Sequence, residues 1–353
     1  MKRNKILTAI LGIAILSGAV CSGMVIAQGI RTGAALSHNV SARKEKFPKP
    51  WDLQKTKLEE FSEISITLSY SNLSILPGDD YYLEYHMDGS CEEPQYEVSD
   101  GRFHFQEGDT QAKYRSGFHI FFIPQNLTAR QEPYYVTLYV PEQTYFDMLN
   151  VSDDSGNMEI GEIQARNADI KLAYGNLTVD SLSGETLSIA ADSGNLELNT
   201  IICDTLELDN EYGNITGDKF QVSSKAAITL DSGNLSLSKL ETETLALANE
   251  YGNCSVDEIH VKNSSISMDS GNLDLGQAVL GTTKIKSSYG DVSLALSDSA
   301  SNYNYNLNTE YGTVKLDGHK IKEDEDGEVH YHKDNGKGSS ISIECESGNV
   351  NIL

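Results

Sequence analysis

The phrase Asp192-Ser193-Gly194-Asn195 recurs along this chain in alternation with a second phrase, Glu211-Tyr212-Gly213-Asn214. Both return as Asp231-Ser232-Gly233-Asn234 and Glu250-Tyr251-Gly252-Asn253, so that successive glycines lie 19 or 20 residues apart. A fixed period of about 20 residues predicts structural units that stack on one another. This repeat decides the fold class before any other feature of the sequence does.

The glycines of these phrases predict tight turns. Glycine takes a positive φ without strain, and the asparagine that follows it tolerates the neighbouring left-handed region. Eight copies keep the spacing in register, and two looser copies follow after gaps of 22 and 36 residues. The predicted turn glycines are Gly156, Gly175, Gly194, Gly213, Gly233, Gly252, Gly271, Gly290, Gly312 and Gly348.

Apolar residues alternate with polar ones on both sides of each turn. Ile228 and Leu230 precede Gly233, and Leu235 and Leu237 follow it. Period two is the pattern of a strand with one buried face, and no single unit can bury that face alone. The sequence therefore predicts an all-β fold, a β-solenoid resembling a single-stranded β-helix, with about ten coils and a repeat of about 19 residues.

Serine and tyrosine alternate before the turn glycine, and the tyrosines form a candidate surface ladder. If one coil has about 19 residues, tyrosines recur on every second coil, about 9.6 Å apart, because parallel strands lie about 4.8 Å apart. A wide coil of two repeats would instead place serine and tyrosine turns on opposite edges; we favour the shorter coil. The alternation breaks at the last tyrosine, where a serine is due. The ladder residues are Tyr174, Tyr212, Tyr251, Tyr289 and Tyr311.

The asparagine after each glycine has two interpretations. Stacked coils would align these side chains into a ladder in which each amide bonds to the next one. The alternative is that asparagine is present for its turn preference alone, and the sequence does not decide between the two.

The chain divides into six expected segments. Twenty-two mostly apolar residues, Ile6 to Ala27, could cross a hydrocarbon core about 30 Å thick as one transmembrane helix. Val25-Ile26-Ala27 also fits a signal cleavage site, which would make the protein secreted. The segments are a membrane anchor or signal at 1–30, a juxtamembrane stalk at 31–57, an N-terminal β cap at 58–150, solenoid repeats at 151–316, a charged loop at 317–339 and a closing coil at 340–353.

The charge of the chain excludes one class of function. The 353 residues include 52 Asp and Glu against 27 Lys and Arg, a formal net charge of −25. Nucleic-acid binding depends on clustered Lys and Arg, so we expect no nucleic-acid partner. Residues 151–316 hold 25 acidic and nine basic side chains, which places most of the excess on the repeats.

Residues for catalysis or cofactor binding are not found in the sequence. Cys254 and Cys345 continue inward-facing alternations and are expected to be small core residues. His330-Tyr331-His332 lies in a charged loop with no rigid metal geometry, and in a calcium loop built on Gly327 the required acidic positions fall on Lys322 and Lys333. We therefore predict that the protein is not an enzyme and has no catalytic residues, metal or cofactor.

Several stretches are similar to a known family. Tyr135 to Pro141, Asp153 to Asn157 and the serial Ser-Gly-Asn and Tyr-Gly-Asn turns resemble a bacterial family of provisionally named adhesins with β-strand repeats, a Toastrack-type domain of unknown function. The stretches 64–77 and 346–350 are similar too, so the resemblance covers about residues 58–353. It implies a β-solenoid on an extracytoplasmic, membrane-tethered protein without established catalytic residues.

These features lead to one expected function and two alternatives. We expect a non-catalytic β-solenoid, held at the cell membrane by a single N-terminal helix with its C-terminal domain outside, that acts as an adhesin-like binding module. Its partners would be the membrane, a cell-envelope polymer, another protein or a cationic peptide. The alternatives are a component that senses envelope stress or antimicrobial peptides, as the resemblance implies for relatives, and an inert structural spacer.

Overall fold

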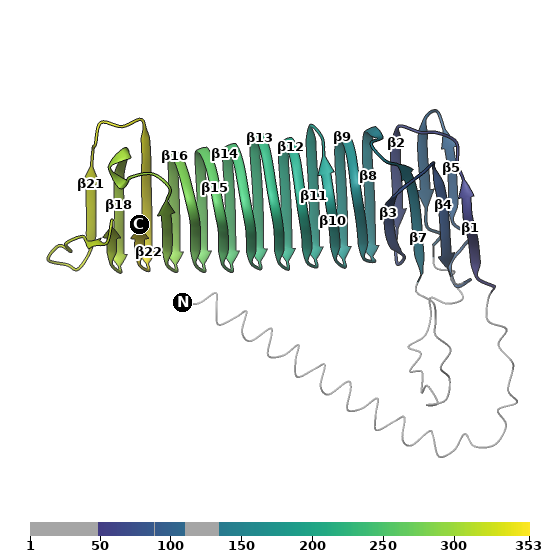
Figure 1. Cartoon of the computed structure of the whole chain (residues 1–353). Coiled ribbons are helices and arrows are strands. Elements are labelled where there is room, and N and C mark those ends of the chain that lie inside the picture. The colour runs from purple at the N-terminus through teal and green to yellow at the C-terminus, as the bar shows by residue number, and fades with distance from the viewer. Residues whose placement is uncertain (1–48, 88, 110–133) are drawn as a thin grey trace, which may run out of the picture. The chain divides into compact units, whose positions relative to one another are not determined.

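Strands dominate the protein. The computed structural model describes residues 49–87, 89–109 and 134–353, so the expected anchor at 1–30 lies outside the described residues. One short 3-10 helix, η2 (Ala300–Asn302), occurs among the strands (Figure 1). The strands are β1 (Trp51–Lys57), β2 (Glu63–Leu68), β3 (Asn72–Gly78), β4 (Tyr82–Met87), β5 (Gln95–Ser99), β6 (Arg102–Gln106), β7 (Tyr135–Pro141), β8 (Tyr145–Ser155), β9 (Met158–Tyr174), β10 (Leu177–Ser183), β11 (Thr186–Ser193), β12 (Leu196–Tyr212), β13 (Ile215–Ser232), β14 (Leu235–Tyr251), β15 (Cys254–Ser270), β16 (Leu273–Tyr289), β17 (Val292–Leu296), β18 (Tyr303–Tyr311), β19 (Val314–Leu316), β20 (His319–Lys320), β21 (Val329–Lys333), β22 (Ser339–Ser347) and β23 (Val350–Ile352).

Each repeat is one coil of a parallel β-solenoid. Leu196 of β12 lies opposite Ile215 of β13, and Tyr212 lies opposite Ser232. A partner 19 or 20 residues further along the chain means that one repeat completes one coil. The shorter of the two coil lengths is therefore the one that occurs, and the prediction of an all-β solenoid is confirmed.

The core is a set of columns that run along the solenoid axis. Leu196, Ile215, Leu235, Cys254 and Leu273 stack in register in five successive coils, and all are at most 1% exposed. Each full burial of a large aliphatic side chain contributes roughly 1.5–3 kcal/mol. Polar residues alternate with these columns and face solvent, as the period-two pattern requires.

The last two coils are stacked in an order that differs from the sequence. The final strands β22 and β23 lie between β16–β17 on one side and β18–β19 on the other, with parallel pairing to both (Figure 1). The chain thus builds the outermost coil first and returns to fill the gap. This order explains why the spacing of the turn glycines is lost between Gly312 and Gly348.

The N-terminal end has the same kind of arrangement. Strands β2 and β3 lie between β8–β9 and the outer strands β6–β7, again with parallel pairing on both sides. Antiparallel strands β4 and β5 pair with β7 and β6, and β1 pairs with β4. Both ends of the solenoid are therefore closed by antiparallel strands, which cover edges that would otherwise be open for pairing.

Two expected segments differ from the structure. The stalk at 31–57 was expected to be irregular, but its last seven residues form β1, because Trp51 and Leu53 pack against the core. The charged loop at 317–339 contains β21, which pairs antiparallel with β18. Within the described residues, no helix is long and apolar enough to cross a membrane.

Candidate functional site

One edge of the solenoid is built from stacked glycine turns. At eight of the ten predicted turn glycines φ lies between +138° and +159°. At Gly233 the N–H donates to the Tyr251 carbonyl at 2.9 Å, and a Cβ would lie 1.7 Å from the Gly213 carbonyl oxygen. Gly156 and Gly312 sit at the same turns without a positive φ, yet a Cβ there would also meet backbone within 2.4 Å. Close stacking of backbone on backbone therefore requires glycine at this edge.

The asparagines that follow the glycines form a hydrogen-bonded ladder. In each step the N–H and the side-chain amide of one asparagine both donate to Oδ1 of the asparagine in the preceding coil. For Asn195 these bonds to Asn176 are 3.0 and 3.3 Å long. Asp291 continues the ladder by accepting from both groups of Asn349, at 2.7 and 3.1 Å. The ladder interpretation holds, and it fixes the register of the turns.

Tyrosine and serine alternate without interruption in space along this edge. Tyr289 lies opposite Ser347, and Ser347 lies opposite Tyr311, because the final strand is inserted between the other two. The break that the sequence shows at Tyr311 therefore disappears in the fold. In spatial order the residues are Ser155, Tyr174, Ser193, Tyr212, Ser232, Tyr251, Ser270, Tyr289, Ser347 and Tyr311.

A sixth tyrosine of this row, Tyr70, is not predicted from the repeat phrase. Leu68 lies opposite Asp153 and Leu73 opposite Met158, so the register places Tyr70 beside Ser155. Tyr70 stands before Ser71 and Asn72, without the Gly-Asn phrase that marks the repeats, but Asn72 accepts the N–H of Asn157 at 2.9 Å. We call the row from Tyr70 to Tyr311 the tyrosine edge; its six tyrosines are between 55% and 74% exposed.

Carboxylates run beside the tyrosine edge. An acidic residue stands two positions before the turn glycine in five successive coils, and four of the five side chains are exposed. Within the described residues none of these carboxylates takes part in an ion pair. They form the acidic row, which is Asp192, Glu211, Asp231, Glu250 and Asp269.

The comparisons with known proteins identify the family. One family model matches residues 61–202 and again residues 183–353, and its description is Toastrack DUF4097. The chain belongs to the Toastrack family. The two matches overlap and together cover most of this Toastrack chain, as expected for a domain made of repeats. No curated protein matches it.

Solved structures with provisional names are similar to the Toastrack chain at low identity. A lipid binding protein from Parabacteroides distasonis is 14% identical over 86% of this chain and 97% of its own, with a TM-score of 0.40. A cell adhesion protein from Clostridium sporogenes is 12% identical over 86% and 99%, with a TM-score of 0.23. An adhesin from Bacteroides fragilis is 12% identical over 86% and 97%, with a TM-score of 0.30.

Between Ala191 and Ser287 the interior of the Toastrack chain alternates together with the tyrosine edge. Beneath tyrosine-bearing turns, Asn210 donates to the Gly194 carbonyl at 3.3 Å and Asn249 to the Gly233 carbonyl at 3.0 Å. Beneath serine-bearing turns the same inward position holds the apolar residues Ala191, Leu230 and Met268. Asn210 and Asn249 thus support two of the turns whose tyrosines stand outside, whereas the apolar Leu172 lies beneath the Tyr174 turn.

Asp153 occupies this inward position in the coil next to Tyr70. Its Oδ1 accepts the Ser155 N–H at 3.0 Å, and within the described residues its Oδ2 has no hydrogen-bond partner. Burial raises the pKa of this carboxyl to about 7, and the nearby Glu107 adds to the shift. Glu107 itself is held by the N–H groups of Ser69 and Tyr70, at 2.7 and 3.0 Å.

Replacing Asp153 by Asn should make the protein more stable at pH 8. Because the folded pKa of Asp153 is about 7 and the unfolded value is near 3.9, the folded state binds more protons between these pH values. Stability therefore falls as pH rises from about 4 to about 7, and Asp153→Asn should abolish that fall, with a gain of up to about 4 kcal/mol at pH 8, since one pKa unit corresponds to about 1.4 kcal/mol. Urea unfolding at pH 4.5, 6 and 8 measures the gain. The exposed neighbour Asp154, changed to Asn, should give no such pH-dependent gain; equal effects of both changes would contradict the assignment.

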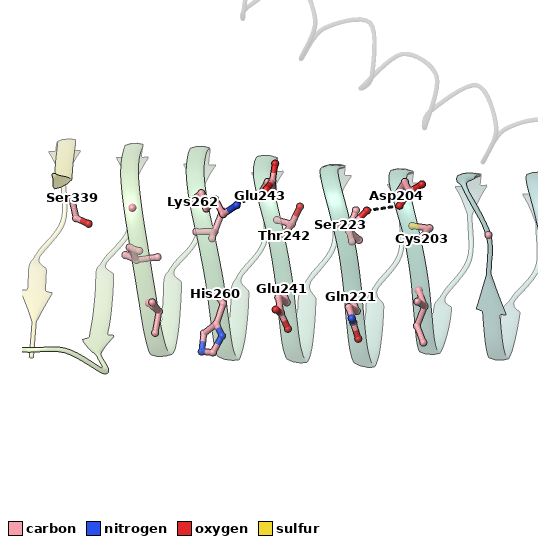
Figure 2. A pocket seen from close by; sticks show the side chains of 17 residues that line it. Cys203, Asp204, Gln221, Ser223, Glu241, Thr242, Glu243, His260, Lys262 and Ser339 are labelled. Carbon is pink, nitrogen blue, oxygen red and sulfur yellow. Dashed lines mark hydrogen bonds and ion pairs between the residues drawn. The ribbon is translucent and has the colours of Figure 1, made fainter.

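A groove lined by residues about half a repeat away from the turn glycines is the main alternative site. It has a volume of about 720 Å³, and Figure 2 shows Glu241 and His260 on successive coils along it. Lys262 pairs with Glu243, and Ser223 donates to Asp204. These partners occupy three of its charged groups, Lys262, Glu243 and Asp204, so the groove has fewer free charges than it has charged residues.

The described cysteines supply no reactive thiol at either place. Burial raises the pKa of the Cys203 thiol beside the groove to about 12, and it also raises the pKa values of Cys254 and Cys345. A thiol with a raised pKa carries little thiolate at neutral pH and is a poor nucleophile. All three residues are buried in the core, which confirms the prediction for Cys254 and Cys345.

A small cluster of metal-binding residue types lies on the end hairpin. Ligand atoms of Asp324, Glu328 and His330 lie within 4.8 Å of one another, which the sequence analysis did not anticipate. His330 Nε2 contacts the Glu328 carboxylate at 3.1 Å, and the Asp324 carboxylate accepts the N–H groups of Asp326 and Glu328. All three side chains are at least partly exposed and already have protein partners, so we assign no metal to them.

Proposed function

We propose that this Toastrack chain is a non-catalytic, adhesin-like binding module that holds its partner along the tyrosine edge. The observation that carries the proposal is the unbroken alternation of tyrosine and serine in space. It persists across both ends of the solenoid, where neighbouring coils are far apart in the sequence. Duplication of one repeat into the next cannot produce a pattern that continues between coils far apart in the sequence. The alternation is therefore a property of the folded surface.

The chemistry of the edge favours an extended partner. Each exposed tyrosine offers a flat apolar ring with a polar hydroxyl, and such side chains supply contact area at small entropic cost. Two coils of about 4.8 Å each separate successive rings by about 9.6 Å. The acidic row makes polyanions poor partners and neutral or cationic polymers good ones.

The place of action that we propose is the outer face of the cell membrane. The supporting feature is the apolar stretch from Ile6 to Ala27, which would anchor the chain as a single-pass protein and leave the C-terminal domain extracytoplasmic. Cleavage after Ala27 would instead release the domain. In either case a cell-envelope polymer is the partner within reach.

Changing tyrosines of the edge to serine should abolish binding without unfolding the protein. Serine already occupies the same turn in every second coil, so the combined change of Tyr174, Tyr212, Tyr251 and Tyr289 to serine is compatible with the local backbone. We expect at least about a tenfold loss of binding to bacterial cell-envelope fragments, because several aromatic contacts are lost together. The measurement is a sedimentation pull-down with the full chain in detergent.

The matched control is Tyr145→Ser, which removes a tyrosine that is 47% exposed away from the edge. The control should bind like the unchanged chain. If the quadruple variant retains its melting temperature and still binds fully, the tyrosine edge is not the binding surface.

A further inference from the structure

We infer that the ligand of the tyrosine edge is a linear 1,4-linked amino-sugar polymer with free, positively charged amino groups. This inference rests on the proposed function and names its substrate class. It comes from two rows that run side by side, one of aromatic rings on every second coil and one of carboxylates on five successive coils, from Asp192 to Asp269.

The spacing of the rings suits an extended chain of pyranoses. Each sugar lengthens an extended 1,4-linked chain by about 5 Å. This is the distance across the ring from C1 to C4 and through the linking oxygen, with bonds near about 1.5 Å long. Two sugars therefore advance about as far as two coils, whose strands are about 4.8 Å apart. Since successive sugars in an extended β-1,4 chain are turned over, every second ring can lay the same C–H face on a tyrosine.

The serines between the tyrosines leave room for the intervening sugars. Ser193, Ser232 and Ser270 are half-buried, whereas Tyr212 and Tyr251 are each 55% exposed. The edge is thus raised at each tyrosine and lowered at each serine. A serine hydroxyl can donate to and accept from the hydroxyls of a sugar that lies above it.

The acidic row supplies the charge complement for amino groups. Neighbouring coils place like charges such as Glu211 and Asp231 opposite one another, which destabilises a sheet unless a cation lies nearby. An ammonium group of the polymer would lie between such carboxylates in charge-assisted hydrogen bonds. Acetylation of the amine removes that charge and should weaken binding.

The length of the edge gives a quantitative test. Ten coil steps separate Tyr70 from Tyr311, so the edge is about 48 Å long and spans about ten sugars. Isothermal titration of the full chain in detergent with β-1,4-linked glucosamine oligomers should show affinity that rises roughly tenfold between four and eight sugars and levels off near ten. Tyr251→Ser should lower the affinity for the octamer about fivefold, and Tyr145→Ser should leave it unchanged.

Control ligands separate this inference from the proposed function. The N-acetylated octamer should bind at least about tenfold more weakly, and polylysine binding should not depend on Tyr251. Glucosamine oligomers that fail to bind, or that bind independently of length or of Tyr251, overturn the inference. If envelope fragments still bind in a tyrosine-dependent manner in that case, the proposed function stands and only the ligand class is wrong. If neither binds, both are wrong.

Discussion

Replacing Gly233 by alanine is expected to destabilise the solenoid by about 4 kcal/mol or more, the largest effect of any single change that we predict. The added Cβ would lie 1.7 Å from the Gly213 carbonyl oxygen, and the residue would be held at a φ of +156°. Backbone of the preceding coil cannot move away without breaking the asparagine ladder, in which Asn234 bonds to Asn214. Thermal unfolding followed by circular dichroism measures the loss.

The matched control for this change is Gly338→Ala. No atom lies within 4 Å of a Cβ at Gly338, and its φ is outside the left-handed region. We expect this variant to unfold within about 2 °C of the unchanged protein, because neutral surface changes alter stability by about 0.5 kcal/mol at most. A melting temperature of Gly233→Ala that equals the control would contradict the stacked-turn geometry.

Deleting residues 339–353 is expected to release the outermost coil, the second large effect. Strands β22 and β23 pair in parallel with β16–β17 on one side and with β18–β19 on the other. Among the described strands, β16–β17 and β18–β19 do not pair with each other. Removal of the inserted strands also exposes the core surface that the fully buried Ile341 and Ile343 cover. Residues 300–338 should become sensitive to limited proteolysis, while the coils up to β16 stay resistant.

A different result would follow if the coils were stacked in sequence order. Strand β18 would then pair directly with β16, and the deletion would leave residues 300–338 packed and resistant. Mass spectrometry of the proteolytic fragments distinguishes the two cases. The unchanged full chain, digested in parallel, is the control.

The repeat phrase was sufficient to predict the middle of the fold. Its period left two coil lengths, of which we favoured the shorter, its alternation predicted the buried columns, and Gly233 was identified as a turn glycine from the sequence. These features are local, because each coil repeats the contacts of the coil before it. The amide ladder was one of two open interpretations until the distances between Asn176 and Asn195 decided it.

The ends of the solenoid could not be predicted in the same way. Strand order there depends on which partner a strand finds far along the chain, and a local pattern does not encode it. Tyr311 therefore looked like a fault in the alternation, and Tyr70 was not recognised as part of it. The only sequence signal for Tyr70 was the asparagine two positions later, Asn72, without a glycine between them.

The fold shows where the acidic residues lie, which the net charge alone does not. Net charge alone excluded nucleic acid as a partner. The fold aligns Glu211, Asp231 and Glu250 in one acidic row beside exposed tyrosines, and this arrangement supports our proposal of a neutral or cationic polymer as the partner.

Nitration of tyrosines in the presence of bacterial cell-envelope fragments tests the central claim, binding along the tyrosine edge, most directly. Tetranitromethane labels exposed tyrosines, and mass spectrometry of the full chain then gives the label at each position. The account predicts that bound fragments protect Tyr70, Tyr174, Tyr212, Tyr251, Tyr289 and Tyr311. Tyr96 and Tyr145, which are 37% and 47% exposed and lie off the edge, should be labelled as in the free protein. Protection of Tyr96 and Tyr145 with full labelling of the edge would contradict it.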